Sequence, residues 1–349
     1  MTQLALQRSD FATLRESQPF ETLSSYLAAW RGYSGVSSRS FLNQVAQLAP
    51  AASVALMVDP DHPIDDCWLE VVAEVTQIEK STLEELAAPL GPWTLHPPCR
   101  HYACIACLDE AGSASQQARL KLWTYATFTT CIFHDLPLIE VPAIGWEWME
   151  LSPAQRKSNA RLMLEPDKLR PNVEAFWNRL DGRLRVGIHR AEVSAWVAPG
   201  GPCRLRTAIQ YERLDEAPVW QAILALLSRS WERHPAPALA ARGLPRDLWL
   251  NGSKKYFGDY HRPVLEALPT IDYFRGISAV NERRACVLVA SDAVRHEYMR
   301  PFLGFNDFYG WRGVLARMPQ PAFEWLVQQS SDWPLHWQDR VECWKRGRK

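Results

Sequence analysis

The sequence predicts a mainly helical protein with small β elements, divided into an N-terminal domain over residues 1–150 and a basic, helix-rich C-terminal domain over residues 151–349. Three observations predict this fold class. The front of the chain has two short segments with apolar residues at helical spacing, separated by a glycine-rich turn. Two pairs of metal-ligating residue types follow, each with a two-residue spacer as in a zinc ribbon. Acidic residues then give way to basic ones near residues 145–151.

The first two predicted helices form a pair that is typical of a helix-turn-helix. Over residues 20–30 the apolar residues follow helical spacing, and the glycines at 32 and 35 then break the helix. A serine at 37, 38 or 40 can cap the second helix, and Pro50 ends it. The residues expected on the apolar faces are Leu23, Tyr26, Leu27 and Trp30 in the first helix, and Phe41, Leu42, Val45 and Leu48 in the second.

The later segments give weaker signals. A capping box at Ser81-Thr82-Leu83-Glu84 predicts a helix over residues 81–90. Residues 176–180 and 219–231 favour helices, whereas the β-branched content of residues 184–197, 204–211 and 285–290 is compatible with strands. The proline-rich stretches at 198–202 and 234–237 indicate loops. The sixteen tryptophans are spread along the chain, which is typical of core residues rather than of a ligand-binding cage.

Composition indicates a globular protein without a membrane span. The 349 residues are 47% hydrophobic and 22% charged, which suffices for two domains with cores of their own. The sequence contains no run of eighteen apolar residues, and its first residues lack the basic start and apolar core of an export signal. We therefore expect a cytoplasmic protein whose eight cysteines are thiols or metal ligands rather than a disulfide framework.

Charge is unevenly distributed, although the formal net charge is zero. Residues 1–150 carry 8 Lys and Arg against 18 Asp and Glu, a net charge of −10, whereas residues 151–349 carry 31 against 21, a net charge of +10. A neutral chain argues against a protein that holds duplex DNA by itself, because such binding rests on neutralising phosphates. The asymmetry fits either separate partners for the two halves or two halves that attract each other.

The clearest chemical signal is a set of four residues, Cys104 and Cys107 followed, after 23 intervening residues, by Cys131 and, three positions further, by His134. Zn²⁺ takes four tetrahedral thiolate and imidazole ligands, and two chelating pairs with two-residue spacers supply them. Four protein ligands leave no position for water, so a structural ion is expected. The alternative is that the cysteines are buried thiols and His134 a surface histidine. Cys99 is close enough in sequence to substitute as a ligand, and the expected core thiols are Cys67, Cys203, Cys286 and Cys343.

Motifs for catalysis are missing from the sequence. It contains no GxxxxGK[ST], HExxH or GxSxG pattern, and the cysteine pairs lack the His-x-Glu partner of a nucleic-acid deaminase. Residues 251–255, Asn-Gly-Ser-Lys-Lys, are at most a solvated or phosphate-touching loop. The paired carboxylates at 65–66 and 84–85 are typical of solvated faces. We therefore expect a protein without catalytic residues.

Several of these motifs, in this order, resemble the TniQ family. Residues 21–27, Glu-Thr-Leu-Ser-Ser-Tyr-Leu, resemble its first helix, and residues 104–108 and 119–138 resemble its C-P-x-C-L and W…C-x-x-H-x-x-x-L elements. The resemblance covers about the first 140 residues, and residues 319–334 resemble the P…F…L…WP ending of such proteins. Two departures matter. Ile105 replaces the usual proline, and residues 141–145 replace a second cysteine pair, which argues against a second zinc site.

The resemblance implies a transposition protein that links a target-recognition module to an AAA+ regulator, which in turn directs the transposase. Longer relatives bind an attachment site in DNA themselves. Shorter relatives, closer to this length, belong to CRISPR-associated transposons, where the protein sits on the RNA-guided Cascade complex, typically as a homodimer. The expected function is therefore that of a non-enzymatic adaptor in DNA integration, stabilised by zinc.

Two alternatives stay open. A stand-alone DNA-binding protein that recognises a transposon attachment site would use the helix pair between Leu23 and Leu48, with Arg39, Asn43 and Gln44 available to read bases. A zinc-dependent enzyme would need an open metal position or a cleft with titratable groups, and the sequence points to neither.

Overall fold

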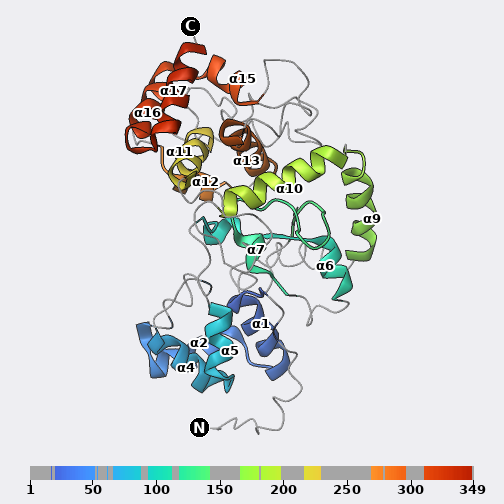
Figure 1. The fold of residues 1–349 in the computed structure, drawn as a ribbon. Helices are drawn as coiled ribbons and strands as arrows, with labels where there is room; N and C mark the ends of the chain where they lie inside the picture. The colour runs from blue at the N-terminus through green and yellow to red at the C-terminus, as the bar shows by residue number, and fades with distance from the viewer. Residues whose placement is uncertain are drawn as a thin grey trace. The chain divides into compact units, whose positions relative to one another are not determined.

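The computed structural model is mainly helical (Figure 1). It describes residues 17, 20–51, 53, 61, 66–87, 93–111, 118–141, 166–180, 182–197, 216–228, 269–277, 280–295 and 310–347. Within these ranges the β structure consists of one two-stranded sheet and three isolated bridges. The predicted class, mainly α with small β elements, is confirmed at that level.

The chain forms two compact units, which are described one at a time. The first contains Met1–Leu90, His101–Trp123 and Ile139–Val173, and the second contains Gly91–Arg100, Thr124–Leu138 and Glu174–Lys349. The change of character expected near residues 145–151 lies outside the described residues.

In the described residues of the first unit, several helices surround one apolar core. They are α1 (Leu23–Ser34), α2 (Ser38–Leu48), α4 (Asp66–Thr76) and α5 (Lys80–Ala87). Helix α4 packs against α2 and α5, and α5 also packs against α1. The core includes the predicted apolar face of α1 and extends it into the other three helices: Leu23, Tyr26, Leu27, Trp30, Phe41, Val45, Trp68, Leu69, Val72, Leu83, Leu86 and Ala87.

Local signals account for the ends of α1 and α2. The Thr22 hydroxyl accepts a hydrogen bond from the Ser25 N–H at the start of α1, and Gly35 ends that helix with a left-handed φ of 67°. The Ser37 hydroxyl then caps α2 by accepting from the Ser40 N–H. Both predicted helices are therefore confirmed.

Three details of these helices differ from expectation. Helix α1 continues through Gly32 to Ser34, because an exposed glycine weakens a helix without ending it. Leu48 is 51% exposed and so does not belong to the apolar face of α2. Helix α5 already begins at Lys80, so Ser81 is a helical residue rather than the cap.

The rest of the first unit is built around a short antiparallel sheet. Strand β1 (Tyr102–Ala103) pairs with β2 (Ile139–Glu140), with Tyr102 opposite Glu140 and Ala103 opposite Ile139. Three further helical elements accompany it, namely α6 (Ile105–Glu110), α7 (Lys121–Thr124) and the first part of α9 (Pro166–Trp177).

The second unit is a helical assembly with α13 at its centre. Helix α13 (Val280–Arg295) packs against α10 (Gly182–Val197), α11 (Ala217–Ser228) and α15 (Gly310–Arg317), while α11 also contacts α12 (Ile271–Arg275) and α16 (Gln320–Gln329). The described part of this unit also contains the short 3₁₀ helices η2 (Pro97–Cys99) and η9 (Ser330–Asp332) and the helix α17 (Leu335–Gly347).

Two segments compatible with strands are helices instead. Residues 184–197 lie in α10, and residues 285–290 lie in α13. Residues 285–290 are all buried, because other helices cover α13 on several sides. A helix covered on several sides loses its polar face and, with it, the 3.6-residue pattern that would have identified it. Of the helix expected over residues 176–180, only residues 176–177 are helical, at the end of α9, and residues 178–180 form a turn. Residues 219–228 of the other expected helix lie in α11. Residues 198–202, 204–211, 229–231, 234–237 and 251–255 lie outside the described residues.

Tryptophan fills the cores of both units, as the sequence suggested. Among the largest fully buried side chains are Trp30, Trp123, Trp177, Trp220, Trp311 and Trp337. Among the helices that the structure describes, none combines the length and the apolar character needed to cross a membrane.

Candidate metal centre

The first pair of candidate ligands lies at the start of α6. Cys104 has an extended backbone at the N-cap position, and Cys107 is the third residue of the helix. The Leu108 N–H donates to the Cys104 carbonyl at 3.2 Å, so the helical turn between the two cysteines is closed. A spacing of three residues on a helical turn places both side chains on the same face.

The second pair lies in a tight loop. The Cys131 N–H donates to the Leu136 carbonyl at 2.7 Å, and the Asp135 N–H donates back to the Cys131 carbonyl at 2.9 Å. Thr130 and Pro137 form an isolated antiparallel bridge at the base of the loop. Asp135 adopts a left-handed φ of 48°, a conformation that Asp tolerates better than most residues and that lets the chain reverse within four residues.

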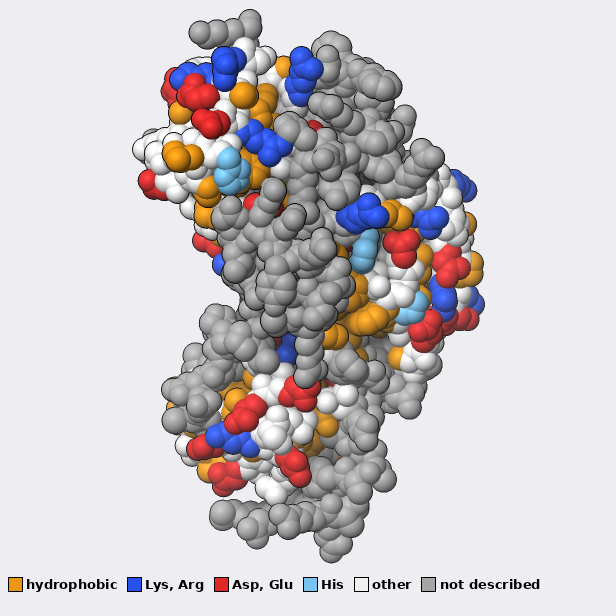
Figure 2. Space-filling view, viewed as in Figure 1, with side chains coloured by type: hydrophobic (Ala, Val, Ile, Leu, Met, Phe, Trp, Pro, Cys, Tyr) orange, Lys and Arg blue, Asp and Glu red, His pale blue; other side chains and the backbone are white. Residues whose placement is uncertain are grey.

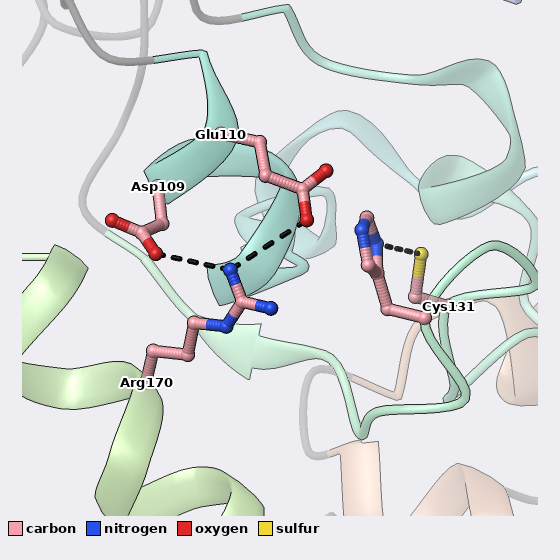
Figure 3. Close-up of polar contacts among 5 residues, drawn as sticks. Asp109, Glu110, Cys131 and Arg170 are labelled. Carbon is pink, nitrogen blue, oxygen red and sulfur yellow. Dashed lines mark hydrogen bonds and ion pairs between the residues drawn. The ribbon is translucent and has the colours of Figure 1, made fainter.

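The four predicted ligands are brought together. The sulfur atoms of Cys104, Cys107 and Cys131 and a ring nitrogen of His134 all lie within 4.8 Å of one another. The Cys131 Sγ atom is 3.7 Å from the His134 Nδ1 atom (Figure 3). A tetrahedron with Zn–S distances of about 2.3 Å and a Zn–N distance of about 2.0 Å has edges of about 3.5–3.8 Å. The cluster therefore has room for one tetrahedral ion after a small contraction, and these residues could bind a metal.

Solvent access to the cluster is limited. Cys104 and Cys131 are buried, while Cys107 and His134 are partly exposed. Both pairs thus contribute one inner and one outer ligand. This arrangement leaves two ligands reachable from the surface, which gives an ion or a chelator a route to the site.

The remaining cysteines are placed differently from one another. Cys99 is buried and lies outside the group of four, with its thiol 3.4 Å from the Gly276 carbonyl as a donor. Cys286 is a buried core residue, as expected. Cys343 is exposed on α17, so the expectation of a core thiol was wrong there. The side chain of Cys67 and all of Cys203 lie outside the description.

Ion pairs surround the segments that carry the ligands. The Arg170 guanidinium of α9 lies 3.0 Å from a carboxylate oxygen of Asp109 and 3.5 Å from one of Glu110, both at the end of α6 (Figure 3). Arg185 of α10 lies 4.0 Å from Asp135 in the tight loop. All of these side chains are partly exposed, so each pair stabilises its segment only weakly, by about 0–1 kcal/mol.

A buried polar cluster that the sequence did not reveal lies at the base of the tight loop. Glu192 of α10 is fully buried, and its two carboxylate oxygens accept hydrogen bonds from Thr129 and Thr130. Arg284 of α13 donates to the hydroxyl and the carbonyl of Thr129 and stacks on the ring of Trp177.

Burial dominates the electrostatics of this cluster. It raises the pKa of Glu192, and the hydrogen bonds from the two threonines and the charge of Arg284 oppose that rise only in part. Burial also lowers the pKa of Arg284, to about 10, so the guanidinium stays protonated at neutral pH while the charge of Glu192 counteracts the shift. The sequence contains one signal for this cluster. In a helix, Glu192 lies on the same face as the apolar residues Ile188 and Trp196, four positions from each, which is unusual for a charged residue.

Comparison with known proteins identified no relative: no family description, curated protein or solved structure matches this chain. The TniQ resemblance therefore rests on the motifs quoted above, and the functional argument rests on the residues themselves.

Proposed function

We propose that this protein is a non-enzymatic, zinc-stabilised adaptor of the TniQ type, which joins a target-recognition module to an AAA+ regulator of transposition. The observation that carries the proposal is the cluster of Cys104, Cys107, Cys131 and His134, because the same four residues are the centre of the TniQ-like motif order. The recognition module is either an RNA-guided Cascade complex or a DNA site, and a homodimer is the expected assembly.

A structural role for the ion follows from the donor set. Three thiolates and one imidazole match the ligand preference of Zn²⁺, and together they complete its tetrahedral coordination. A catalytic zinc ion keeps a position for water or substrate, which four protein ligands leave no room for. A zinc-dependent enzyme is therefore the least supported of the three functions considered.

The charges favour an adaptor with two surfaces of different character. Exposed acidic side chains gather over α4 and α5 (Figure 2), and they include Glu70, Glu74, Glu79, Glu84 and Glu85. Lys80 is paired there with Glu70 at 3.0 Å and with Glu84 at 3.8 Å, which leaves an excess of negative charge. The segment 151–349 instead carries a net charge of +10. Complementary charge speeds association with one partner and disfavours another, so the two surfaces suit two partners.

Co-purification tests the adaptor. The tagged chain is mixed separately with an AAA+ regulator of transposition and a Cascade-type complex, and both are expected to be retained. The double variant Glu84→Lys/Glu85→Lys should weaken one partnership and spare the other. The matched control, Glu324→Lys/Asp332→Lys, makes the same charge change at exposed positions of α16 and η9 and should leave both intact. Retention of neither partner by the unmodified chain contradicts the adaptor.

A second candidate function is direct recognition of a transposon attachment site. It is favoured by the outer face of α2, where Arg39, Asn43 and Gln44 are exposed while Phe41 and Val45 are buried. Such side chains form bidentate hydrogen bonds with bases in the major groove. If the chain protects a defined duplex from nuclease, and Asn43→Ala abolishes that protection, this function replaces the adaptor.

A further inference from the structure

The tight loop that carries Cys131 and His134 is anchored at its base by side chains from two helices. Thr129 and Thr130 immediately precede Cys131, and every polar group of Thr129 takes part in the anchor. Its N–H donates to a Glu192 carboxylate oxygen at 3.0 Å, and its carbonyl accepts from the Leu138 N–H at 2.9 Å. The base of the loop is therefore fixed from α10 as well as by its own hairpin bonds.

The hydroxyl of Thr129 connects the two anchoring charges. It donates to Glu192 and accepts from the Arg284 Nε–H at 3.0 Å, which defines the direction of both hydrogen bonds. A second Arg284 nitrogen donates to the Thr129 carbonyl at 3.2 Å. The other Glu192 oxygen accepts from the Thr130 hydroxyl. The carboxylate thus holds both Thr129 and Thr130, and the guanidinium holds Thr129 from the other side.

The short loop transmits this anchoring to the ligands. Only Ile132 and Phe133 separate Cys131 from His134, and the loop is closed by hydrogen bonds at both of its ends, so it has little freedom to bend internally. The orientation of the loop, and with it that of Cys131 and His134, must therefore be set by the residues at its base, Thr129 and Thr130. A metal site binds more tightly when its ligands are held in place before the ion arrives, and loss of an outer hydrogen-bond partner typically weakens binding about 10–100-fold.

We propose that Glu192 and Arg284 are positioning residues of the metal centre, which hold Thr129 and Thr130 so that Cys131 and His134 point toward the other two ligands. This inference rests on the zinc site proposed above. Glu192 and Arg284 are not among the four ligands, and they act through the two threonines. Their replacement should lower metal affinity without changing the number of ligands.

Competition with a chromophoric chelator tests the proposal, with Zn²⁺ as the probe and the full-length protein. Glu192→Ala should weaken Zn²⁺ binding about 10–100-fold. Glu192→Gln should recover most of the affinity, because its amide oxygen still accepts from Thr129 and its NH₂ group donates to the Thr130 hydroxyl. The matched control is Ile188→Val, which removes a buried methylene from the same face of α10, one turn from Glu192, and should leave affinity unchanged.

A second variant covers the case in which Glu192→Ala does not fold. Thr130→Val keeps the shape of the loop base, removes the single hydrogen bond to Glu192, and should weaken Zn²⁺ binding several-fold. The absorption spectrum of the Co²⁺-loaded protein provides a separate readout, because displaced ligands alter its bands while the stoichiometry stays at one. If folded Glu192→Ala or Thr130→Val binds Zn²⁺ as tightly as the unmodified chain, the positioning role is wrong. If the unmodified chain binds no Zn²⁺, the metal centre itself is wrong.

Discussion

Ser24 donates both its backbone N–H and its hydroxyl to Asp61, one to each carboxylate oxygen and each at 2.7 Å. Both residues are buried, and Ser24 is the second residue of α1. The N–H groups in the first turn of a helix have no partner within the helix, and the partial positive charge there favours a carboxylate. Asp61 therefore fixes the start of α1 from 37 residues away in the chain.

We predict that Asp61→Ala lowers the free energy of unfolding of the first unit by about 1–3 kcal/mol, because it removes the acceptor of the buried Ser24 N–H and one of the two partners of the Ser24 hydroxyl, which keeps the Thr22 hydroxyl at 3.1 Å. Amide hydrogen exchange of α1, followed with increasing urea, measures this change. The control Glu74→Ala removes an exposed carboxylate from α4 and should change stability by no more than about 0.5 kcal/mol. Equal protection of α1 in both variants would contradict the assigned role of Asp61.

Two glycines at the end of α1 should respond in opposite directions to alanine. Gly32 is exposed inside the helix with open space around an added methyl group, so Gly32→Ala should stabilise the protein by about 0.5–1 kcal/mol. Gly35 has a φ of +67°, where a Cβ atom is strained, so Gly35→Ala should destabilise it by about 1–2 kcal/mol. Thermal unfolding of the two variants, side by side, checks both signs. If both variants were more stable than the unmodified protein, helix propensity alone would govern this turn; if both were less stable, backbone strain alone would.

The sequence was most informative where structure is set by neighbouring residues. Both ends of α1 and the start of α2 follow from Thr22, Gly35 and Ser37, each acting within three or four residues. Helix α13 was missed because residues 285–290 are buried among other helices, so its pattern depends on contacts that no short window contains. The exposed position of Leu48 likewise depends on how α2 lies against the other helices.

The same distinction applies to the candidate site. The pairs Cys104 with Cys107 and Cys131 with His134 were recognisable because a chelating spacer is itself a local pattern. Glu192 was not, since it lies 62 positions beyond Thr130, and its spacing of four residues from Ile188 and Trp196 marks a buried acidic residue only once residues 184–197 are known to be a helix. Its role becomes apparent only when α10 is packed.

Purified protein should contain about one zinc ion per chain, and the double substitution Cys107→Ser/Cys131→Ser should reduce this to near zero. Serine keeps the shape of each side chain but is a poor ligand for Zn²⁺, and two of the four ligands are lost. Elemental analysis after extensive dialysis measures the content. Cys343→Ser, at an exposed cysteine outside the cluster, is the control and should retain the metal.

Removal of the metal should also destabilise the segments that carry its ligands before it destabilises the helical cores. Because binding energy of a structural zinc ion contributes directly to folding, chelation should increase amide exchange at residues 104–107 and 131–138 first. Exchange in α11, whose residues are almost all buried, should be affected least. A uniform rise across the chain would mean that the site does not organise its own neighbourhood.

Glu192 should impose a characteristic pH dependence on stability. Burial raises its pKa in the folded protein above the ordinary glutamate value, so over the pH range between the two values the folded chain binds more protons than the unfolded chain. The free energy of unfolding must then fall as pH rises through that range, and the stabilisation that protonated Glu192 contributes at lower pH is lost. Glu192→Gln does not titrate and lacks this decline.

The difference between the unmodified protein and Glu192→Gln isolates the effect below about pH 9, because the other titrating groups, including the metal ligands, are common to both proteins and Arg284, with a pKa of about 10, stays protonated. We expect the unfolding free energy of the unmodified protein, measured by urea titration with Zn²⁺ in excess, to decrease relative to that of Glu192→Gln as pH increases. Carbon-13 NMR of the glutamate carboxyl groups should show one resonance that titrates above the others and is absent from the variant. A difference that moves toward the unmodified protein would mean that Arg284 and the threonine donors outweigh burial, and that Glu192 is held as a carboxylate throughout.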